Sequence, residues 1–265
     1  MTDKNYATLA LANPQAQVLQ ITLNRPDFAN AFNTQMATDL MHCFEALAMD
    51  AGDIRCIVLT GAGERAFCAG GDLKECDGMS NEAWTAQHLV YERMIRAVID
   101  CPIPLIAAVN GAAFGGGCEL ACAADFIYAA DNARFAMTET SLGIIPGAGG
   151  TQTLGRALGE RRAKELIMSA RRFDAEQAHR WGLVNQVLTP ENLLDEVLQV
   201  AGRIAANAPI AVRQAKQAIH RGLQMSLSDG LAFEIEAYNR TVPTEDRREG
   251  VRAFNEKRPA QFQGK

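Results

Sequence analysis

Short apolar runs rich in β-branched residues recur along the first half of the chain. Such a run, bounded by polar or turn-forming residues, is typical of a strand buried on both faces. We therefore expect strands over residues 18–23, 54–60, 103–109 and 126–130. Alternating apolar and polar positions before residue 18 indicate one more strand near the N-terminus.

Helical periodicity occupies the gaps between these strands. Thr34 can cap a helix that runs to about Asp50, because its hydroxyl can accept from a free backbone N–H group. Ser80 precedes a second helix over residues 81–100, whose apolar side chains fall on one face. Strands that alternate with helices predict an α/β core.

The pattern changes after about residue 150, where helices predominate. We expect helices over residues 160–170, 174–181, 191–207, 210–222, 226–240 and 245–257, with a strand only over 183–188. No short repeat, low-complexity tract or linker interrupts this stretch.

Composition and charge limit the possible classes of protein. The 265 residues are 48% hydrophobic and 22% charged, which is ordinary for a globular chain and excludes a disordered or collagen-like one. No apolar run reaches the roughly 18 residues that a membrane span needs. The net charge of −5 argues against a non-specific grip on nucleic acid. Thr2, Asp3 and Lys4 do not begin a secretion signal, so we expect a cytoplasmic protein.

Cysteine and histidine spacings do not indicate a metal site. None of the seven cysteines forms a CxxC pair, so we expect small buried residues in a reducing compartment and no bound metal. The four histidines also lack ligand spacing, and no GxSxG elbow is present. We interpret the histidines as surface or packing residues; they are His42, His88, His179 and His220.

One glycine-rich segment, residues 61–66, matches the dinucleotide fingerprint GxGxxA on paper. Pro102 and Pro104 interrupt the second unit that such a fold requires, and no acidic residue ends a strand about twenty positions on. A nicotinamide or flavin cofactor is therefore not expected.

Two further glycine-rich segments each fall between a strand and a helix start. They are Phe67-Cys-Ala-Gly-Gly-Asp72 and the stretch from Val109 to Leu120, which contains Gly115-Gly-Gly117. Helix starts expose unpaired backbone N–H groups, and glycine lets a ligand approach them closely. A pair of such segments suggests two N–H donors aimed at one oxygen atom.

Two carboxylates accompany the second of these segments. Glu119 lies within apolar sequence, and Glu139 follows twenty residues later. Burial would raise their pKa values and fit them for acid–base chemistry. The alternative is that both are glutamates at helix starts, where the helix dipole favours negative charge.

At these residues the chain resembles the enoyl-CoA hydratase/isomerase (crotonase) superfamily, over essentially its whole length. The resemblance is carried by Leu23-Asn-Arg-Pro26, Ala31-Phe-Asn33, Phe67–Asp72, Ile106–Gly111, Gly115–Leu120, Leu142–Gln152, Asp246–Gly250 and Phe254–Pro259. It implies a spiral of ββα units over residues 1–195 and a helical, trimerising region over 196–265. It also implies an acyl-CoA thioester as substrate, a trimer or dimer of trimers, and no cofactor other than the coenzyme A of the substrate.

The resemblance also assigns roles to individual residues. The N–H groups of Gly71 and Gly116 are expected to form an oxyanion hole, with Glu119 and Glu139 as the acid/base pair. The expected coenzyme A positions are Ala69, Gly71, Asp72, Leu73, Lys74, Gly116, Phe254 and Lys257, the last two approaching from a neighbouring subunit in some relatives. The basic residues that surround Lys257 have two readings, a solvated helix face or a phosphate site.

Within the superfamily, the C-terminal half is most similar to 3-methylglutaconyl-CoA hydratases, in segments such as Ala163–Ile167 and Thr241–Thr244. This resemblance predicts hydration of a 3-branched glutaconyl-CoA, in leucine or acyclic isoprenoid breakdown. The alternatives are a short-chain hydratase of fatty-acid β-oxidation, an enoyl-CoA isomerase and a thioester hydrolase. Some similar proteins bind RNA through a lysine-lined helix, but residues 34–50 contain no lysine or arginine, so no nucleic-acid partner is expected.

Overall fold

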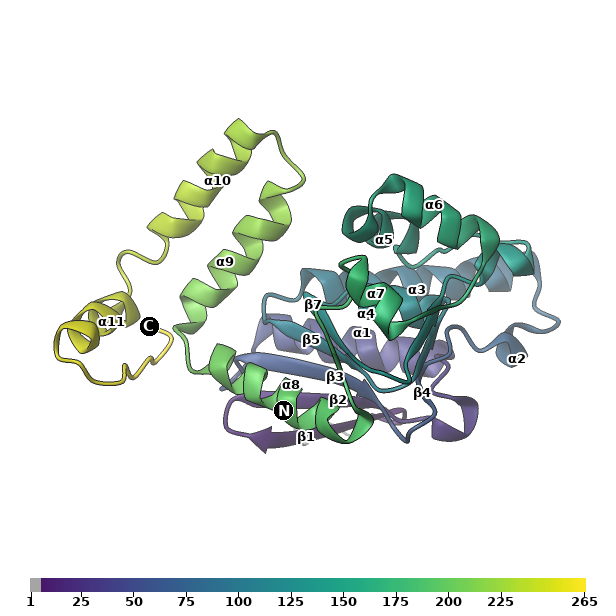
Figure 1. The fold of residues 1–265 in the computed structure, drawn as a ribbon, viewed down its shortest axis with the longest axis horizontal. Coiled ribbons are helices and arrows are strands. Elements are labelled where there is room, and N and C mark those ends of the chain that lie inside the picture. The colour runs from purple at the N-terminus through teal and green to yellow at the C-terminus, as the bar shows by residue number, and fades with distance from the viewer. Residues whose placement is uncertain (1–5) are drawn as a thin grey trace.

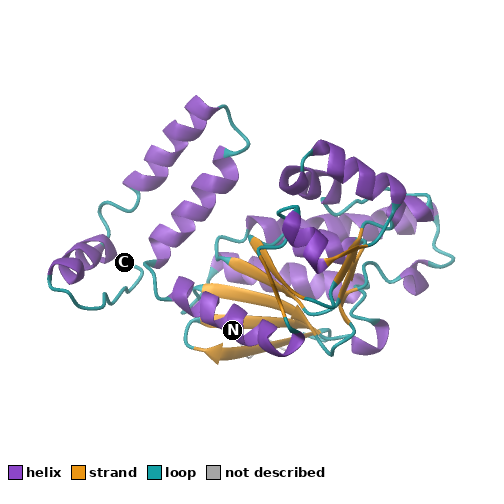
Figure 2. Cartoon of the chain, viewed as in Figure 1, coloured by secondary structure: helices purple, strands orange, loops and turns teal. Residues whose placement is uncertain are grey.

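The computed structural model describes residues 6–265, which form two β-sheets surrounded by helices (Figures 1 and 2). The six-stranded sheet has the order β1 (Leu9–Gln15), β2 (Val18–Leu23), β3 (Cys56–Gly61), β5 (Leu105–Val109), β7 (Phe126–Ala130) and β10 (Gln186–Leu188). The four-stranded sheet has the order β4 (Ala66–Cys68), β6 (Ala112–Phe114), β8 (Arg134–Ala136) and β9 (Phe173–Asp174). The predicted α/β class and crotonase-like spiral are therefore confirmed.

The central strands run parallel and are buried on both faces. In register, Ile57 pairs with Leu105, and Ile106 pairs with Phe126. Every residue of β3 and β5 is buried, which explains why the sequence shows them as continuous apolar runs.

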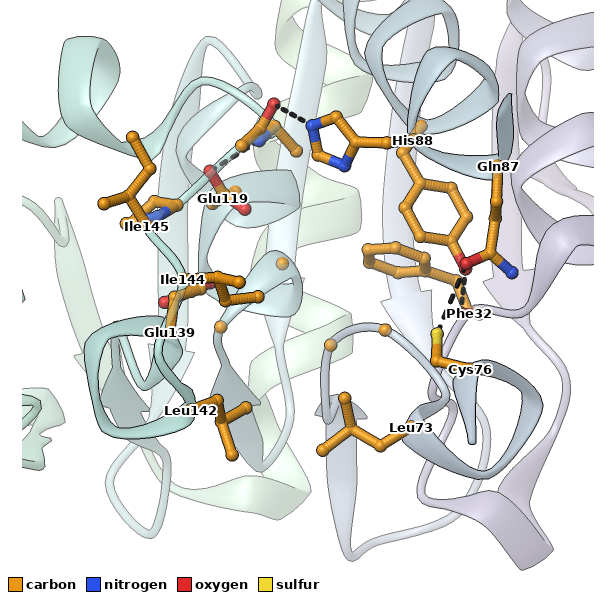
Figure 3. Close-up of a pocket in the computed structure, with 18 of the residues that line it drawn as sticks. Phe32, Leu73, Cys76, Gln87, His88, Glu119, Glu139, Leu142, Ile144 and Ile145 are labelled. Atoms are coloured by element: carbon orange, nitrogen blue, oxygen red, sulfur yellow. Dashed lines mark hydrogen bonds between the residues drawn. The ribbon is translucent and has the colours of Figure 1, made fainter. Parts of the chain in front are cut away.

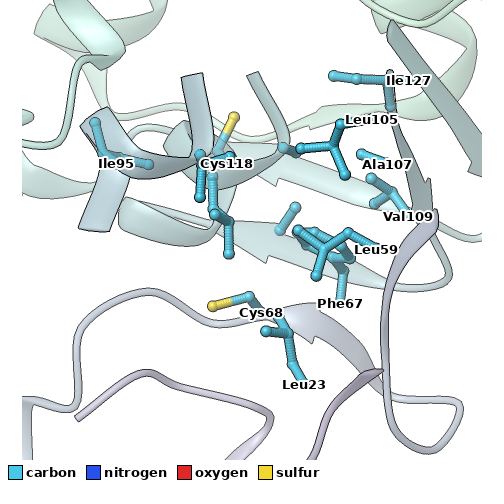
Figure 4. Close-up of a cluster of buried hydrophobic side chains, with 14 of the residues drawn as sticks. Leu23, Leu59, Phe67, Cys68, Ile95, Leu105, Ala107, Val109, Cys118 and Ile127 are labelled. Atoms are coloured by element: carbon cyan, nitrogen blue, oxygen red, sulfur yellow. The ribbon is translucent and has the colours of Figure 1, made fainter. Parts of the chain in front are cut away.

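Alternate residues of these strands contact different layers. Val58 and Ile106 pack against Val197 of α8 (Pro190–Ala205), which covers the outer face of the sheet. Leu59 and Leu105 belong instead to the main core, between the two sheets and the remaining helices. Figure 4 shows part of that core, including Leu59, Leu105, Ala107, Phe67 and Cys68.

Three successive turns of the spiral each contribute one strand to the larger sheet and one to the smaller sheet. The pairs are β3 with β4, β5 with β6, and β7 with β8, and like strands lie parallel to one another. The loops that follow β4, β6 and β8 therefore leave the smaller sheet at neighbouring points.

The helices that flank the site begin at well-defined caps. In α1 (Thr34–Met49) the cap is Asn33, whose side chain accepts from Met36 N at 3.0 Å. The expectation that Thr34 caps this helix was wrong, because Thr34 is its first residue. Ser80 caps α3 (Asn81–Asp100) as predicted, accepting from Ala83 N.

The remaining helices lie mostly in the second half of the chain. They are α2 (Leu73–Cys76), α4 (Gly116–Cys122), α5 (Gly150–Leu158), α6 (Glu160–Ser169), α7 (Ala175–Arg180), α9 (Pro209–Gly222), α10 (Leu227–Asn239) and α11 (Glu245–Asn255), with short 3-10 helices η1 (Pro26–Phe28) and η2 (Glu139–Leu142). Figure 1 shows α9, α10 and α11 as an arm that projects from the body containing the sheets. The division into residues 1–195 and 196–265 stays a prediction, and its boundary falls within α8.

Several sequence expectations concern burial and location. Six of the seven cysteines are buried and Cys122 is half-buried, as expected for small packing residues. No helix in the described part of the chain is long and apolar enough to span a bilayer. Residues 2–4, used above to judge the absence of a secretion signal, lie outside the described residues.

Candidate active site

Two glycine turns meet beside the smaller sheet. Gly70 has φ +95°, a conformation that favours glycine, and a Cβ atom there would lie 2.7 Å from Phe114 O and 3.2 Å from Gly116 N. Gly117 lies so close to the end of β4 that an added Cβ would approach Cys68 O to 2.0 Å. The absence of side chains therefore lets the two turns touch.

Each turn presents a backbone N–H group without an acceptor. Within residues 6–265, the N–H groups of Gly71 and Gly116 make no hydrogen bond. Gly116 is the first residue of α4, where helix geometry leaves N–H groups unpaired. Both residues line the same cavity, so both donors are available to one ligand.

Glu119 lies in the first turn of α4 and is almost fully buried, with 3% of its surface exposed. Its Oε1 atom accepts from Ala148 N at 2.9 Å and from Gly150 N at 2.7 Å. Burial raises the pKa of Glu119 to about 7, with a smaller contribution from the charge of Glu139, while the two N–H donors oppose the rise.

Glu139 begins η2 and is also buried, with 7% of its surface exposed. Burial raises the pKa of this carboxyl above its ordinary value. Its Oε2 atom has no hydrogen-bond partner among the described residues. A buried oxygen in that state is able to bond to a ligand in the cavity.

The two glutamates and the two glycines line one cavity of about 710 Å³ (Figure 3). This volume is within the range of small-molecule sites. Its wall is mainly apolar: Phe32, Leu73, Trp84, Leu89, Tyr91, Leu142, Ile144, Ile145 and Pro146 all contribute. Glu119 and Glu139 thus occupy helix starts, as the alternative reading held, and also converge on a common space.

The predicted coenzyme A positions divide into two groups. Ala69, Gly71, Leu73 and Gly116 line the cavity. Asp72 does not, because its carboxylate pairs with Arg25 at 2.9 Å and caps α2 through Lys74 N. Lys74 is exposed and also lies outside the cavity lining.

Phe254 and Lys257 are not brought to the cavity within one chain. Both lie at the end of the arm formed by α9, α10 and α11, and Phe254 is 83% exposed (Figure 1). The basic residues around Lys257 are partly neutralised, because Arg252 and Arg258 both pair with Glu249. These pairs favour the solvated-face reading of that cluster.

Sequence reasoning missed His88 and Tyr91 of α3 as parts of the cavity wall. Trp84, His88 and Tyr91 follow one another at helical spacing and line the cavity together. That spacing was a usable signal. The interpretation of His88 as a surface or packing residue was incomplete, since its ring packs against Gly147 and also borders the cavity.

A polar cluster connects the short helix α2 to its surroundings. Glu75 Oε2 accepts from Thr34 N and from Gln87 Nε2, each at 2.8 Å. Gln87 Oε1 in turn accepts from Cys76 Sγ at 3.3 Å. These bonds fix the segment that follows Gly71 against α1 and α3, and no sequence pattern indicated them.

Residues 61–66 lead from β3 directly into β4 rather than into a helix. The dinucleotide fingerprint requires a helix start at that point, so residues 61–66 do not form a dinucleotide-binding turn. Within residues 6–265, no three His, Cys, Asp or Glu side chains are grouped to hold a metal ion. The expectations of no metal and no separate cofactor stay predictions.

A spiral of paired strands that brings two N–H donors and two buried glutamates to one apolar cavity is the arrangement of a crotonase-fold protein. The model of the enoyl-CoA hydratase/isomerase family matches residues 13–265, and the chain belongs to that family. The crystal structure of an enoyl-CoA hydratase from Bacillus anthracis superposes with a TM-score of 0.95 at 43% identity, covering 97% of this chain and 100% of that one.

Two relatives are similar over nearly their whole lengths. The Bacillus subtilis protein YngF is 47% identical over 244 residues, which are 92% of this chain and 94% of YngF. The short-chain-enoyl-CoA hydratase of Clostridium acetobutylicum is 40% identical over 244 residues, 92% of this chain and 93% of that enzyme.

Proposed function

We propose that this protein is an enoyl-CoA hydratase, which adds water across the 2,3-double bond of an acyl-CoA thioester. The observation that carries the proposal is the convergence of Glu119, Glu139 and the free N–H groups of Gly71 and Gly116 on one cavity. A conjugated thioester needs both parts, donors for its carbonyl oxygen and a base and acid for water.

The proposed reaction runs through an enolate. The oxygen of water bonds to C3, the π electrons of the double bond move to the thioester oxygen, and a water proton passes to Glu119. The N–H groups of Gly71 and Gly116 stabilise the negative oxygen, and removing one such donor typically costs on the order of 10²–10³ in kcat. The enolate oxygen then re-forms the thioester carbonyl, and the electron pair of the C1–C2 double bond takes the proton of Glu139 at C2. The product is a 3-hydroxyacyl-CoA. Proton exchange with solvent restores both carboxyls.

Hydrogen bonding supports this division of roles. Two N–H groups donate to Glu119 Oε1, which favours its ionised form and hence its action as a base. Glu139 has no such donor on Oε2 among the described residues, so no hydrogen bond at that oxygen favours its ionised form. Because the two carboxyls interact, they titrate as a pair.

The cavity wall bears on the acyl group. Among the described residues that line it, none is a lysine or arginine, and most are aliphatic or aromatic. Burying the distal carboxylate of a glutaconyl group without a partner would be unfavourable. The wall therefore gives more support to an uncharged short acyl chain than to the 3-branched glutaconyl group expected from the sequence.

A panel of thioesters tests the activity and the acyl group together. We expect crotonyl-CoA and hexenoyl-CoA to be hydrated with higher kcat/KM than 3-methylglutaconyl-CoA. A preference for the glutaconyl substrate would overturn the assignment of an uncharged chain and leave the hydratase chemistry intact. Isomerase activity is distinguished with a 3-enoyl-CoA: it moves the double bond without ¹⁸O uptake from labelled water, and finding only that reaction would refute the hydratase proposal.

Self-association is the second part of the proposal. The arm carries exposed apolar side chains, with Leu223 and Leu227 each 80% exposed and Phe254 83% exposed. A trimer or dimer of trimers would cover such a surface and could bring Phe254 and Lys257 to the coenzyme A of a neighbouring subunit. Sedimentation velocity should show a trimer or hexamer, and Leu223→Glu with Leu227→Glu should produce monomers.

A further inference from the structure

The loop that donates the Ala148 N–H group to Glu119 is rich in glycine. Gly147, Gly149 and Gly150 surround Ala148, and Gly149 has φ +97°. Glycine allows many backbone conformations, so aiming the Ala148 N–H group at Glu119 requires an external contact. In the described structure, two side chains outside α5 hydrogen-bond to the backbone of residues 146–149. One is Glu119, which accepts from Ala148 N, and the other is His88, which contacts Gly147 O.

His88 and Glu119 bind opposite ends of one peptide group (Figure 3). His88 Nε2 lies 3.2 Å from Gly147 O, and the N–H of the same peptide, that of Ala148, lies 2.9 Å from Glu119 Oε1. A carbonyl oxygen only accepts, so Nε2 carries the hydrogen and donates. The donor at one end of the peptide polarises it and strengthens the N–H bond at the other.

The imidazole also fixes the position of this peptide by direct packing. A Cβ atom at Gly147 would lie 2.3 Å from His88 Cε1 and 2.5 Å from Nε2, so only glycine admits the ring there. The ring also lies edge-on to Tyr91, with centroids 6.3 Å apart. Tyr91 is itself buried and donates to Phe32 O.

We propose that His88 is a positioning residue for the hydration reaction, acting on Glu119 through the Gly147–Ala148 peptide. It orients and polarises the N–H group that stabilises the ionised carboxylate of Glu119. This inference rests on the proposed function, because it needs Glu119 as the base. His88 is not assigned contact with the reacting atoms.

The proposal makes a directional statement about titration. Removing the His88 donor weakens a hydrogen bond to the charged form of Glu119, so the pKa of Glu119 rises. The other titratable groups that face this pair are Glu139 on η2, Cys118 on α4 and Tyr91 on α3. All three side chains are retained in the His88 variants, and of the three only Tyr91 is in ring contact with His88.

Two substitutions separate the hydrogen bond from simple packing. His88→Leu keeps bulk and removes the donor, whereas His88→Gln keeps an amide donor that can reach Gly147 O. We expect His88→Leu to lower kcat for crotonyl-CoA about tenfold, the effect of losing one hydrogen bond, with KM within about threefold of the parent. His88→Gln should recover most of kcat. His42→Leu, an exposed position on α1, is the matched control and should match the parent.

Titration of Glu119 gives a readout that does not need turnover. The ¹³C signal of its carboxyl, assigned by its loss in Glu119→Gln, should have a higher midpoint pH in His88→Leu than in the parent or in His88→Gln. The acid limb of kcat/KM should move in the same direction. If the parent fails to hydrate any enoyl-CoA but the midpoint still shifts, the proposed function fails and the coupling between His88 and Glu119 stands.

Two results would overturn the role of His88. One is an unchanged midpoint and kcat in His88→Leu. The other is equal loss in the Leu and Gln variants with a raised KM and no shift of the midpoint, which would indicate packing or direct substrate contact. Gly147→Ala offers an independent check: it should impair the parent strongly and the His88→Ala variant much less, because the collision with the ring is then absent.

Discussion

The Oε1 atom of Glu119 lies 2.7 Å from the backbone N of Gly150, the first residue of α5. A buried carboxylate is thereby placed at the positive end of a helix dipole, with a second N–H donor from Ala148. This contact partly offsets the cost of burying the charge. It also joins the base proposed for the reaction to a residue 31 positions away along the chain.

Replacing either glutamate by glutamine should leave the fold intact and remove most activity. Glu119→Gln and Glu139→Gln are nearly isosteric with the parent, but neither amide transfers a proton as the reaction requires. We expect kcat to fall by about 10²–10⁴ in each variant, as is typical for loss of a general acid or base. Crotonyl-CoA hydration is the assay, and calorimetric binding of a 3-hydroxyacyl-CoA serves as control. Near-parent kcat in either variant would remove that residue from the mechanism.

Burial of Glu119 makes stability depend on pH. Its folded pKa of about 7 exceeds the ordinary value of 4.5, so the native state binds its proton more tightly than the unfolded chain does. Stability is therefore lost as the pH rises from about 4.5 to about 7, by on the order of 3 kcal/mol. Glu119→Gln abolishes this term, so its free energy of unfolding relative to the parent should increase between pH 5 and pH 8.

Urea titrations at the two pH values measure that change. The exposed Glu45→Gln on α1 provides the comparison for a solvated carboxyl. A difference between Glu119→Gln and the parent that stays constant from pH 5 to pH 8 would show that burial does not raise the pKa of this carboxyl.

The proposed oxyanion hole is best tested at Gly71. A Cβ atom at Gly71 meets only Tyr91 Cε2, at 3.9 Å, so Gly71→Ala keeps the N–H group and fits. Gly71→Pro removes the N–H group. No hydrogen bond of the described structure is lost with it, because that N–H group has no acceptor there. We expect kcat to fall at least 10²-fold in the proline variant and only a few-fold in the alanine variant. Equal kcat values for two folded variants would exclude this N–H group from the reaction.

Gly116 does not allow the same comparison. A Cβ atom at Gly116 would lie 2.4 Å from Phe32 Cζ, so Gly116→Ala displaces the ring that forms one wall of the cavity. Loss of activity in Gly116→Ala would therefore report on packing as well as on hydrogen bonding.

The ion pair between Arg25 and Asp72 should stabilise the turn that carries Gly71. The exposed fractions of the two side chains are 14% and 10%, and Arg25 also donates to Ala31 O. Asp72→Ala leaves the guanidinium without its carboxylate and removes the cap of α2, so we expect a loss of about 2–4 kcal/mol in urea unfolding. Glu92→Ala breaks the exposed pair with Arg96 and should cost far less. Equal losses of unfolding free energy in Asp72→Ala and Glu92→Ala would mean that burial does not make the Arg25–Asp72 pair more stabilising than an exposed one.

The long buried strands could be predicted because their signal is local. Every position of β3 and β5 is buried, so the apolar runs identify them without knowledge of their partners. Strands β6 and β8 have three residues each, too few to show a period. Their pairing depends on neighbours from other turns, which explains why the apolar pattern alone does not reveal β6 and β8.

Helix α5 shows a different limit of sequence reasoning. It starts at Gly150 after a glycine-rich loop, which by itself reads as irregular chain. The acceptor that satisfies its first N–H group is Glu119, from another turn of the fold. His88 is similar, because its role depends on a loop 59 residues away that no local pattern connects to it.

Three successive turns of the spiral each place a group proposed to act in the reaction just after a strand of the smaller sheet: Gly71 after β4, Gly116 after β6 and Glu139 after β8. The first two groups are main-chain atoms, which any residue except proline supplies. At Gly116 the nearby Phe32 ring limits which residues fit, whereas Gly71 has room for a Cβ atom, so neither position depends on the chemistry of a side chain. Leu73, Trp84 and Leu89, which line the cavity, lie instead between β4 and β5, so substitutions there change the shape of the cavity without altering these three groups.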